Sequence, residues 1–282
     1  MRDERRVLSE VHPCCLTIAG SDSGGNAGVQ ADLRTFHSYK LHGCTVFTAL
    51  TAQNPNGVYA INEIAADFVS AQLDAILGTY SIAALKTGML GSAGVVEAVV
   101  DRLKAFPAIF KVVDPVMVAT SGAELAGAAT RIAMEEQLLP LATLITPNIP
   151  EAEALSGRMV ESLEDVRSAA KCLYDKFGAA ILIKGGHQTR NTGEAEDILF
   201  DGKEYSSFSL PRIENPISTH GTGCTLSSAI ASNLAKGYDL ESSIQRAKDY
   251  ISGALDAMLD LGQGSGPMNH AFNLNGKYAE KN

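Results

Sequence analysis

The fold class is first visible in residues 14–32, which read CCLTIAGSDSGGNAGVQAD. An apolar run, expected as a strand over Cys14–Ala19, ends in a glycine-rich turn, and a helix is expected over Ala27–Tyr39. A strand that passes through glycines directly into a helix is typical of an α/β protein. The turn matches neither G-x-G-x-x-G nor a Walker A loop, which argues against a dinucleotide site and a P-loop enzyme.

Short apolar runs alternate with longer amphipathic segments along the rest of the chain. This alternation predicts a doubly wound α/β fold, a mostly parallel sheet with helices on both faces. The other expected strands are Cys44–Leu50, Ile82–Lys86, Lys111–Asp114, Thr143–Thr146 and Ala180–Lys184. The other expected helices are Asp67–Leu77, Ala93–Lys104, Leu163–Phe177, Thr222–Ala235 and Leu240–Leu261. The segments Asp197–Phe200 and Glu204–Phe208 flank Asp201-Gly202, which predicts an antiparallel hairpin at a sheet edge.

Length and composition favour one domain that acts on a small molecule. The 282 residues, 45% of them hydrophobic, fit a single domain over 1–282, with loosely held termini at 1–13 and 262–282. The net charge of -9 argues against a nucleic-acid partner and against an anionic membrane surface. No stretch approaches the roughly 18 apolar residues of a membrane span. The five cysteines lack CxxC spacing, so we expect a reducing cytoplasm, with neither a zinc site nor a disulfide framework.

Two glycine-rich turns stand where ligands bind in such sheets, beyond the carboxyl ends of the strands. In Gly20–Asp32 the backbone can approach a ligand closely, although a plain turn with an Asp cap explains the same residues. The stretch STHGTGCTLSSAIASNL, Ser218–Leu234, opens a helix whose N-terminus can hold an anion. Cys224 lies in its first turn, where a lowered thiol pKa is expected, and the alternative is a small buried thiol.

Charged residues follow three further strands. Asp114 begins DPVM, and Asn148 and Glu151 stand three apart in TPNIPEAE, where they can face one Mg-phosphate cluster or simply complement a helix dipole. Lys184, in ILIKGGH, leaves a strand at a glycine turn, where it can meet a phosphate or point into solvent.

Seven motifs in register resemble one family over about Leu16–Leu261. They are AGSDSGGNAGVQADLRTF, TALTAQN, KTGML, DPVM, TPNIPEAE, ILIKGGH and STHGTGCTLSSAIA. Together they resemble the hydroxymethylpyrimidine and phosphomethylpyrimidine kinases of thiamine biosynthesis. The resemblance implies a ribokinase-like fold without a separate lid domain, usually as a homodimer. It also implies ATP-dependent phosphorylation of the hydroxymethylpyrimidine and then of its monophosphate.

The resemblance also implies roles for matching positions. The residues around the pyrimidine would be Gly20, Ala27, Asp32, Gln53 and Met89. The residues serving ATP would be Asp114, Asn148, Lys184 and Thr219, with Glu151 and Asp114 at Mg²⁺. The anion hole would be Gly221, Thr222 and Gly223, followed by Cys224 as the base where sugar kinases carry Asp. Asn26 departs from the family, whose members more often have Gly or another small residue there.

Two other functions remain open from the sequence. A pyridoxal or pyridoxine kinase of the same Cys-containing branch acts on a similar flat ring with a hydroxymethyl group, and competition between the two substrates would separate them. A non-catalytic pyrimidine-binding paralogue would bind the pyrimidine without consuming ATP.

Overall fold

The computed structural model describes residues 12–54, 56–117, 126–185, 193–211, 220–261 and 267–275. Its strands form one nine-stranded sheet in the order β3-β2-β1-β4-β5-β6-β7-β8-β9. The strands are β1 (Cys14–Asp22), β2 (His42–Asn54), β3 (Gly57–Glu63), β4 (Ile82–Thr87), β5 (Phe110–Val113), β6 (Leu144–Ile145), β7 (Ala180–Lys184), β8 (Glu194–Phe200) and β9 (Tyr205–Pro211). The six adjacent strands β2, β1, β4, β5, β6 and β7 pair in parallel. The outer strands β3, β8 and β9 pair antiparallel.

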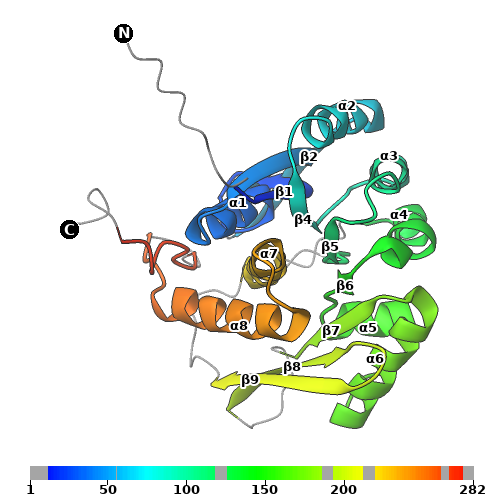
Figure 1. The fold of residues 1–282 in the computed structure, drawn as a ribbon, viewed down its shortest axis with the longest axis vertical. Helices are drawn as coiled ribbons and strands as arrows, with labels where there is room; N and C mark the ends of the chain where they lie inside the picture. The colour runs from blue at the N-terminus through cyan, green and yellow to red at the C-terminus, as the bar shows by residue number, and fades with distance from the viewer. Residues whose placement is uncertain are drawn as a thin grey trace.

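Helices cover both faces of this sheet (Figure 1). They are α1 (Gly28–Ser38), α2 (Ala66–Leu77), α3 (Ala93–Leu103), α4 (Ala128–Ala133), α5 (Ile149–Ser156), α6 (Leu163–Phe177), α7 (Thr222–Ala235) and α8 (Leu240–Asp256). Alternate residues of each strand point to opposite faces. In β1, Leu16 and Ile18 pack with α2 and α3 in the hydrophobic core on one face of the sheet. Cys15 packs with α1, α7 and α8 in a second hydrophobic core on the other face. The sheet is therefore buried on both sides, as the apolar runs predict.

The strand order creates a switch point between β1 and β4. β1 pairs with β2 on one side and with β4 on the other, and ligands of open α/β sheets bind beyond the carboxyl ends of strands at such a switch point. Helix α7 packs over β1, β4 and β5, so its N-terminus lies at this position.

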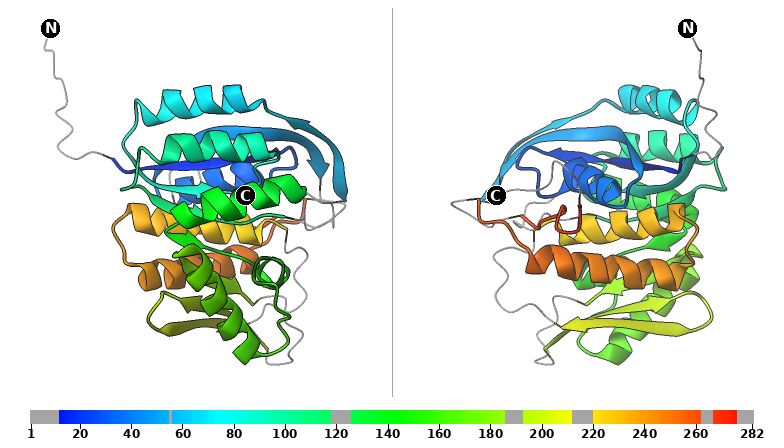
Figure 2. Two further views of the ribbon diagram at one scale, coloured as in Figure 1. Left: turned by 90° about the vertical axis from the view of Figure 1, so that its right-hand side faces the viewer. Right: turned by 60° about the vertical axis from the view of Figure 1, so that its left-hand side comes forward.

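The structure adds one strand and extends others. β3 was not expected, although Asn56-Gly57 is a strong turn signal and β2 continues four residues past the predicted end at Leu50. β2 and β3 reach beyond the neighbouring strands (Figure 2). Helix α4, which was also not expected, runs into a π-helix over Met134–Leu138.

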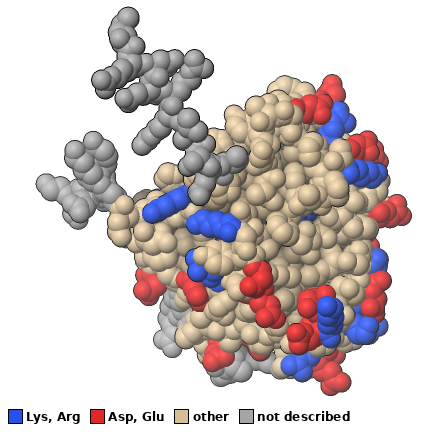
Figure 3. Space-filling view, in the orientation of Figure 1, with Lys and Arg blue, Asp and Glu red and all other residues tan. Residues whose placement is uncertain are grey.

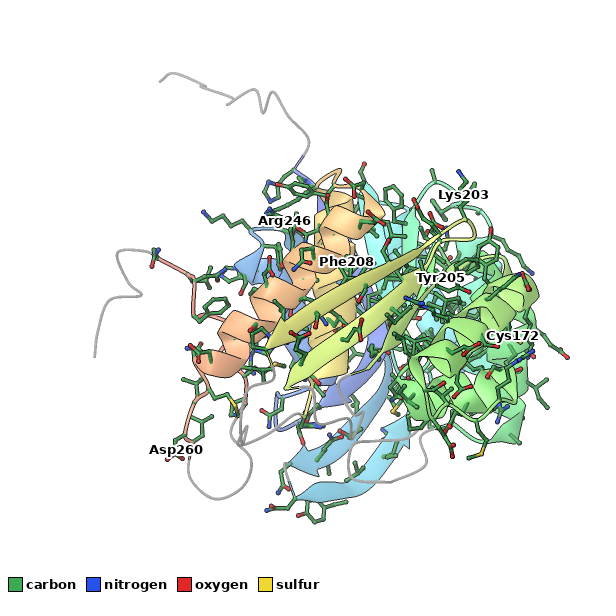
Figure 4. The ribbon with its side chains drawn as sticks, turned by 90° about the horizontal axis from the view of Figure 1, so that it is seen from below. Cys172, Lys203, Tyr205, Phe208, Arg246 and Asp260 are labelled. Carbon is green, nitrogen blue, oxygen red and sulfur yellow. The ribbon has the colours of Figure 1, made fainter. Side chains whose placement is uncertain are left out.

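The hairpin predicted around Asp201-Gly202 is confirmed at the sheet edge, as β8 and β9. Its two faces have different neighbours, which Figure 4 shows from below. Phe208 is buried in the core with α7 and α8. Tyr205 stacks on Phe200 with ring centroids 4.5 Å apart, and its hydroxyl donates to the Arg167 carbonyl of α6. The hairpin thus joins both helix layers.

The expectation of a loosely held C-terminus is wrong for residues 267–275. Met268 and His270 are 2% and 5% exposed, and the segment lies against α8 (Figure 1). Helix α8 itself ends at Asp256 and not at Leu261. Acidic and basic side chains are interspersed on the face seen in Figure 3. Within the part of the chain that the structure describes, no helix has both the length and the apolar character needed to cross a bilayer.

Candidate active site

Three charged residues meet beyond the carboxyl ends of β5, β6 and β7. The Lys184 ammonium lies 2.8 Å from Asp114 Oδ1 and 3.9 Å from Glu151 Oε2. A Cβ at Gly223 would lie 3.3 Å from Lys184 Nζ and 3.7 Å from Asp114 Oδ2. The start of α7 therefore lies directly against Lys184 and Asp114. We call the three residues Asp114, Glu151 and Lys184 the carboxylate-lysine cluster.

Asn148 and Glu151 hold each other at the start of α5. The Glu151 N–H donates to Asn148 Oδ1 at 2.9 Å, and the Asn148 N–H donates to Glu151 Oε2 at 2.8 Å, which is a capping box. The two residues therefore cap helix α5 beside Lys184, and their contact with a Mg-phosphate cluster stays a prediction. Burial raises the pKa of Glu151 to about 7, with a smaller contribution from Asp114, while Lys184 opposes the rise.

The turn before α7 fits tightly against the glycine loop (residues 20–27). Gly221 has a φ of 86°, and a Cβ there would lie 1.9 Å from the Asn26 carbonyl oxygen. Only glycine suits this position. Among the described residues, no side chain caps the N-terminus of α7, whose first residues are Thr222, Gly223 and Cys224. A helix start of this kind directs backbone N–H groups and a positive dipole toward an anion.

The Asp22 carboxylate organises the glycine loop from within. It accepts hydrogen bonds from the N–H groups of Gly24, Asn26 and Ala27 at 2.8 to 3.0 Å. Burial alone would raise the pKa of Asp22, but hydrogen bonds from His220 and from the backbone lower it overall. The loop is therefore held by an ionised carboxylate. Asn26, which departs from the family pattern, is buried, with 5% of its surface exposed.

The structure brings four of the five expected substrate residues to this end of the sheet. A Cβ on Gly20 would lie 3.6 Å from the Met89 sulfur. Gln53 Nε2 is 3.1 Å from His220 Nε2, and His220 Nε2 is 3.4 Å from Asp22 Oδ2. Ala27, at the end of the glycine loop, follows the Asn26 carbonyl that Gly221 approaches. Ala27 and Gln53 thus lie beside the turn before α7, and Gly20 and Met89 lie against each other.

Asp32, the fifth, does not line this region. It has no exposed surface and bonds to Lys86 Nζ at 3.0 Å, Thr17 Oγ1 at 2.5 Å and Ser228 Oγ at 2.6 Å. Asp32 therefore supports α7 from beneath, and its contact with the pyrimidine stays a prediction. The sequence analysis did not identify Lys86, Thr17 or Ser228 as partners of Asp32. The available signal was a lysine inside an apolar strand.

The expectation of a lowered Cys224 thiol pKa is wrong. Burial raises the pKa, and Asp32 and Asp114 raise it further; Lys86 and a hydrogen bond from the Gly28 N–H oppose the rise but do not reverse it. Thr219, expected near the ATP phosphates, lies outside the described residues.

The chain is similar to known proteins over most of its length. The family model for phosphomethylpyrimidine kinase matches residues 22–269. A hydroxymethylpyrimidine/phosphomethylpyrimidine kinase of Haemophilus influenzae is 46% identical, over 90% of this chain and 95% of its own length. A thiamine biosynthesis bifunctional protein of Geobacter sulfurreducens is 47% identical over 90% of this chain, which spans about half (51%) of that longer protein.

A solved structure agrees with the predicted ribokinase-like fold. The ADP complex of Bacillus subtilis pyridoxal kinase has a TM-score of 0.86 at 37% identity, and the match covers 94% of this chain and 100% of that one. The family model spans most of the sequence and the Haemophilus relative is similar over almost its entire length. The chain therefore belongs to the phosphomethylpyrimidine kinase family.

Proposed function

We propose that the chain transfers the γ-phosphoryl group of ATP to the primary hydroxyl of a hydroxymethylpyrimidine and then phosphorylates the resulting monophosphate. The observation that carries this proposal is the contact between the carboxylate-lysine cluster and the start of α7, where Gly223 lies against Lys184 and Asp114. Positive and metal-binding groups therefore converge on one anion position, beside the glycine loop. Phosphoryl transfer depends mainly on such positioning and charge stabilisation.

We propose that Asp114 and Glu151 hold Mg²⁺ together with oxygens of ATP. In the described residues no three His, Cys, Asp or Glu side chains are grouped to hold a metal alone. Two carboxylates completed by phosphate oxygens are the usual environment of Mg²⁺, which neutralises charge on the phosphates when bound. Asp114 and Glu151 raise the pKa of Lys184 despite its burial, so this ammonium stays charged beside the phosphates.

In the first transfer the substrate hydroxyl oxygen bonds to the γ-phosphorus, and the bond from that phosphorus to the ADP oxygen breaks. The hydroxyl proton passes to the Cys224 sulfur, for which the thiolate form is needed. Burial keeps most of this thiol protonated near neutral pH. In the second transfer the acceptor is a phosphate oxygen that is already ionised near pH 7, so little base catalysis is required.

We also propose that the chain is a single kinase domain that forms a homodimer in the cytoplasm. Tyr59, Ile61 and Phe68, on β3 and α2, are 67%, 43% and 60% exposed, and exposed apolar side chains of this kind suit contact with a second copy. The five cysteines are unpaired, which suits a reducing compartment. Light scattering after size-exclusion chromatography would test the dimer, and a monomer at micromolar concentration would contradict it.

The experiment that tests the catalytic proposal measures ADP release with Mg-ATP and each of four acceptors. These are hydroxymethylpyrimidine, its monophosphate, pyridoxal and ribose, with products identified by mass. Turnover of both pyrimidines supports the proposal. Preferred turnover of pyridoxal would keep the mechanism but replace the substrate, and pyrimidine binding without ADP release would indicate a non-catalytic protein.

A further inference from the structure

The C-terminal segment (residues 267–275) makes hydrogen bonds to the three helices α1, α7 and α8. The His270 carbonyl accepts a hydrogen bond from the Tyr250 hydroxyl of α8 at 2.9 Å and another from the Ser38 hydroxyl of α1. The Asn269 N–H donates to the Ala254 carbonyl at 3.0 Å. The segment is therefore positioned by backbone contacts that do not involve the His270 ring.

The His270 imidazole points to α7. Its Nε2 lies 3.0 Å from Thr225 Oγ1, and its Nδ1 has no hydrogen-bond partner in the described structure. Burial, with a smaller contribution from Arg34 on α1, lowers the pKa of His270 to about 4, so the ring is neutral at physiological pH. A buried histidine ring that makes one hydrogen bond, to a hydroxyl group, holds that hydroxyl in a fixed position.

Thr225 links this bond to the expected reaction centre. It follows Cys224 directly, has no exposed surface, and its N–H donates to the Gly221 carbonyl at 2.9 Å. This is the bond that closes the first turn of α7. On the other side, Arg34 donates to the Gly25 carbonyl of the glycine loop. The surroundings of His270 thus touch both the anion turn and the substrate loop.

We propose that His270 is a positioning residue that fixes the first turn of α7 through Thr225 and so sets the location of Cys224 and the anion-binding N–H groups. This role extends the site into the C-terminal segment (residues 267–275). Its kinetic part rests on the proposed kinase function, whereas its structural part does not.

The test compares His270→Leu, Thr225→Val and the double variant with the control Tyr250→Phe. The control removes a hydrogen bond to the same residue but leaves the imidazole on Thr225. We expect each single site variant to lower kcat about tenfold with KM for ATP nearly unchanged. The loss of kcat in the double variant should be no larger than in either single variant, since His270→Leu and Thr225→Val remove the same hydrogen bond. His270→Gln, whose amide reaches the position of Nε2, should recover most of the loss.

A second readout needs no kinase activity. The alkylation rate of Cys224 by iodoacetamide, followed on its peptide by mass spectrometry, should change several-fold in His270→Leu and Thr225→Val but not in Tyr250→Phe. Equal effects of His270→Leu and Tyr250→Phe, additive losses in the double variant, or an unchanged alkylation rate would overturn the proposal. An inactive wild-type protein with the expected alkylation pattern would contradict the kinase function and leave the positioning role supported.

Discussion

The ammonium nitrogen of Lys86 lies 3.0 Å from both carboxylate oxygens of Asp32, and neither side chain has exposed surface. Asp32 also accepts hydrogen bonds from Thr17 and Ser228, so the pair joins β1, β4, α1 and α7 beneath the start of α7. Breaking one partner of such a pair leaves an uncompensated buried charge.

Asp32→Asn should therefore lower the free energy of unfolding by about 3 to 5 kcal/mol. Asp175→Asn is the matched control, because its ion pair with Lys171 is more than half exposed on both sides. The control should change stability by about 0.5 kcal/mol or less. Urea unfolding measures both, and similar small effects would show that the buried pair does not support the fold.

Cys224 should give the two phosphorylation steps different pH dependences. Its pKa is raised, so the thiolate is scarce at neutral pH and becomes more abundant as pH rises. The first step should accelerate about tenfold per pH unit from pH 7 to 8.5, whereas the second should change little, since its acceptor is already ionised. Rates measured separately on the pyrimidine and its monophosphate check this.

Replacing the thiol should separate the same two steps. Cys224→Ala should lower kcat for the hydroxymethylpyrimidine by about a hundredfold, the usual size of a general-base contribution, and leave the monophosphate reaction nearly intact. Equal loss of both activities would count against the base assignment.

Gly221 should tolerate no side chain. Gly221→Ala adds a methyl group 1.9 Å from the Asn26 carbonyl at a φ of 86°. Gly237 is the control, because its φ is 84° but nothing lies within 4 Å of an added Cβ. Gly237→Ala should cost about 1 kcal/mol of stability from backbone strain alone. Gly221→Ala should lower the melting temperature more and abolish most activity, and equal melting temperatures would contradict the tight fit.

Glu151 should control the metal requirement. Glu151→Gln keeps an oxygen that can accept the Asn148 N–H but removes a charge from the proposed Mg²⁺ site. The Mg²⁺ concentration for half-maximal rate should rise about tenfold. Glu153→Gln, on the same helix but bonded to the Val160 N–H, should leave that concentration unchanged.

The sequence predicted the parts of the fold that follow local rules. Apolar runs located the parallel strands, and Asp201-Gly202 located the edge hairpin. The strand β3 is mostly exposed, so it has no apolar alternation to reveal it. The segment 267–275 holds its place through contacts with residues far along the chain, such as Ser38 and Thr225, which local patterns do not encode.

The site was predicted as a set of residues but not as an electrostatic environment. Motif order placed Asp114, Glu151 and Lys184 together, because their strands end at the same edge. The burial of Asp32 and the raised pKa of Cys224 depend on how α7 packs over β4, which is a tertiary property. A helix-dipole argument alone gave the wrong sign for Cys224, since desolvation is the larger effect.

The proposed activity is sequential phosphorylation of one pyrimidine at one site. Its most direct test is a time course of purified protein with Mg-ATP and hydroxymethylpyrimidine, in which mass spectrometry follows both phosphorylated products. We expect the monophosphate to appear first and then to be converted to the diphosphate, with two ADP released per pyrimidine. No phosphorylated pyrimidine at any time, with ATP intact, would contradict it.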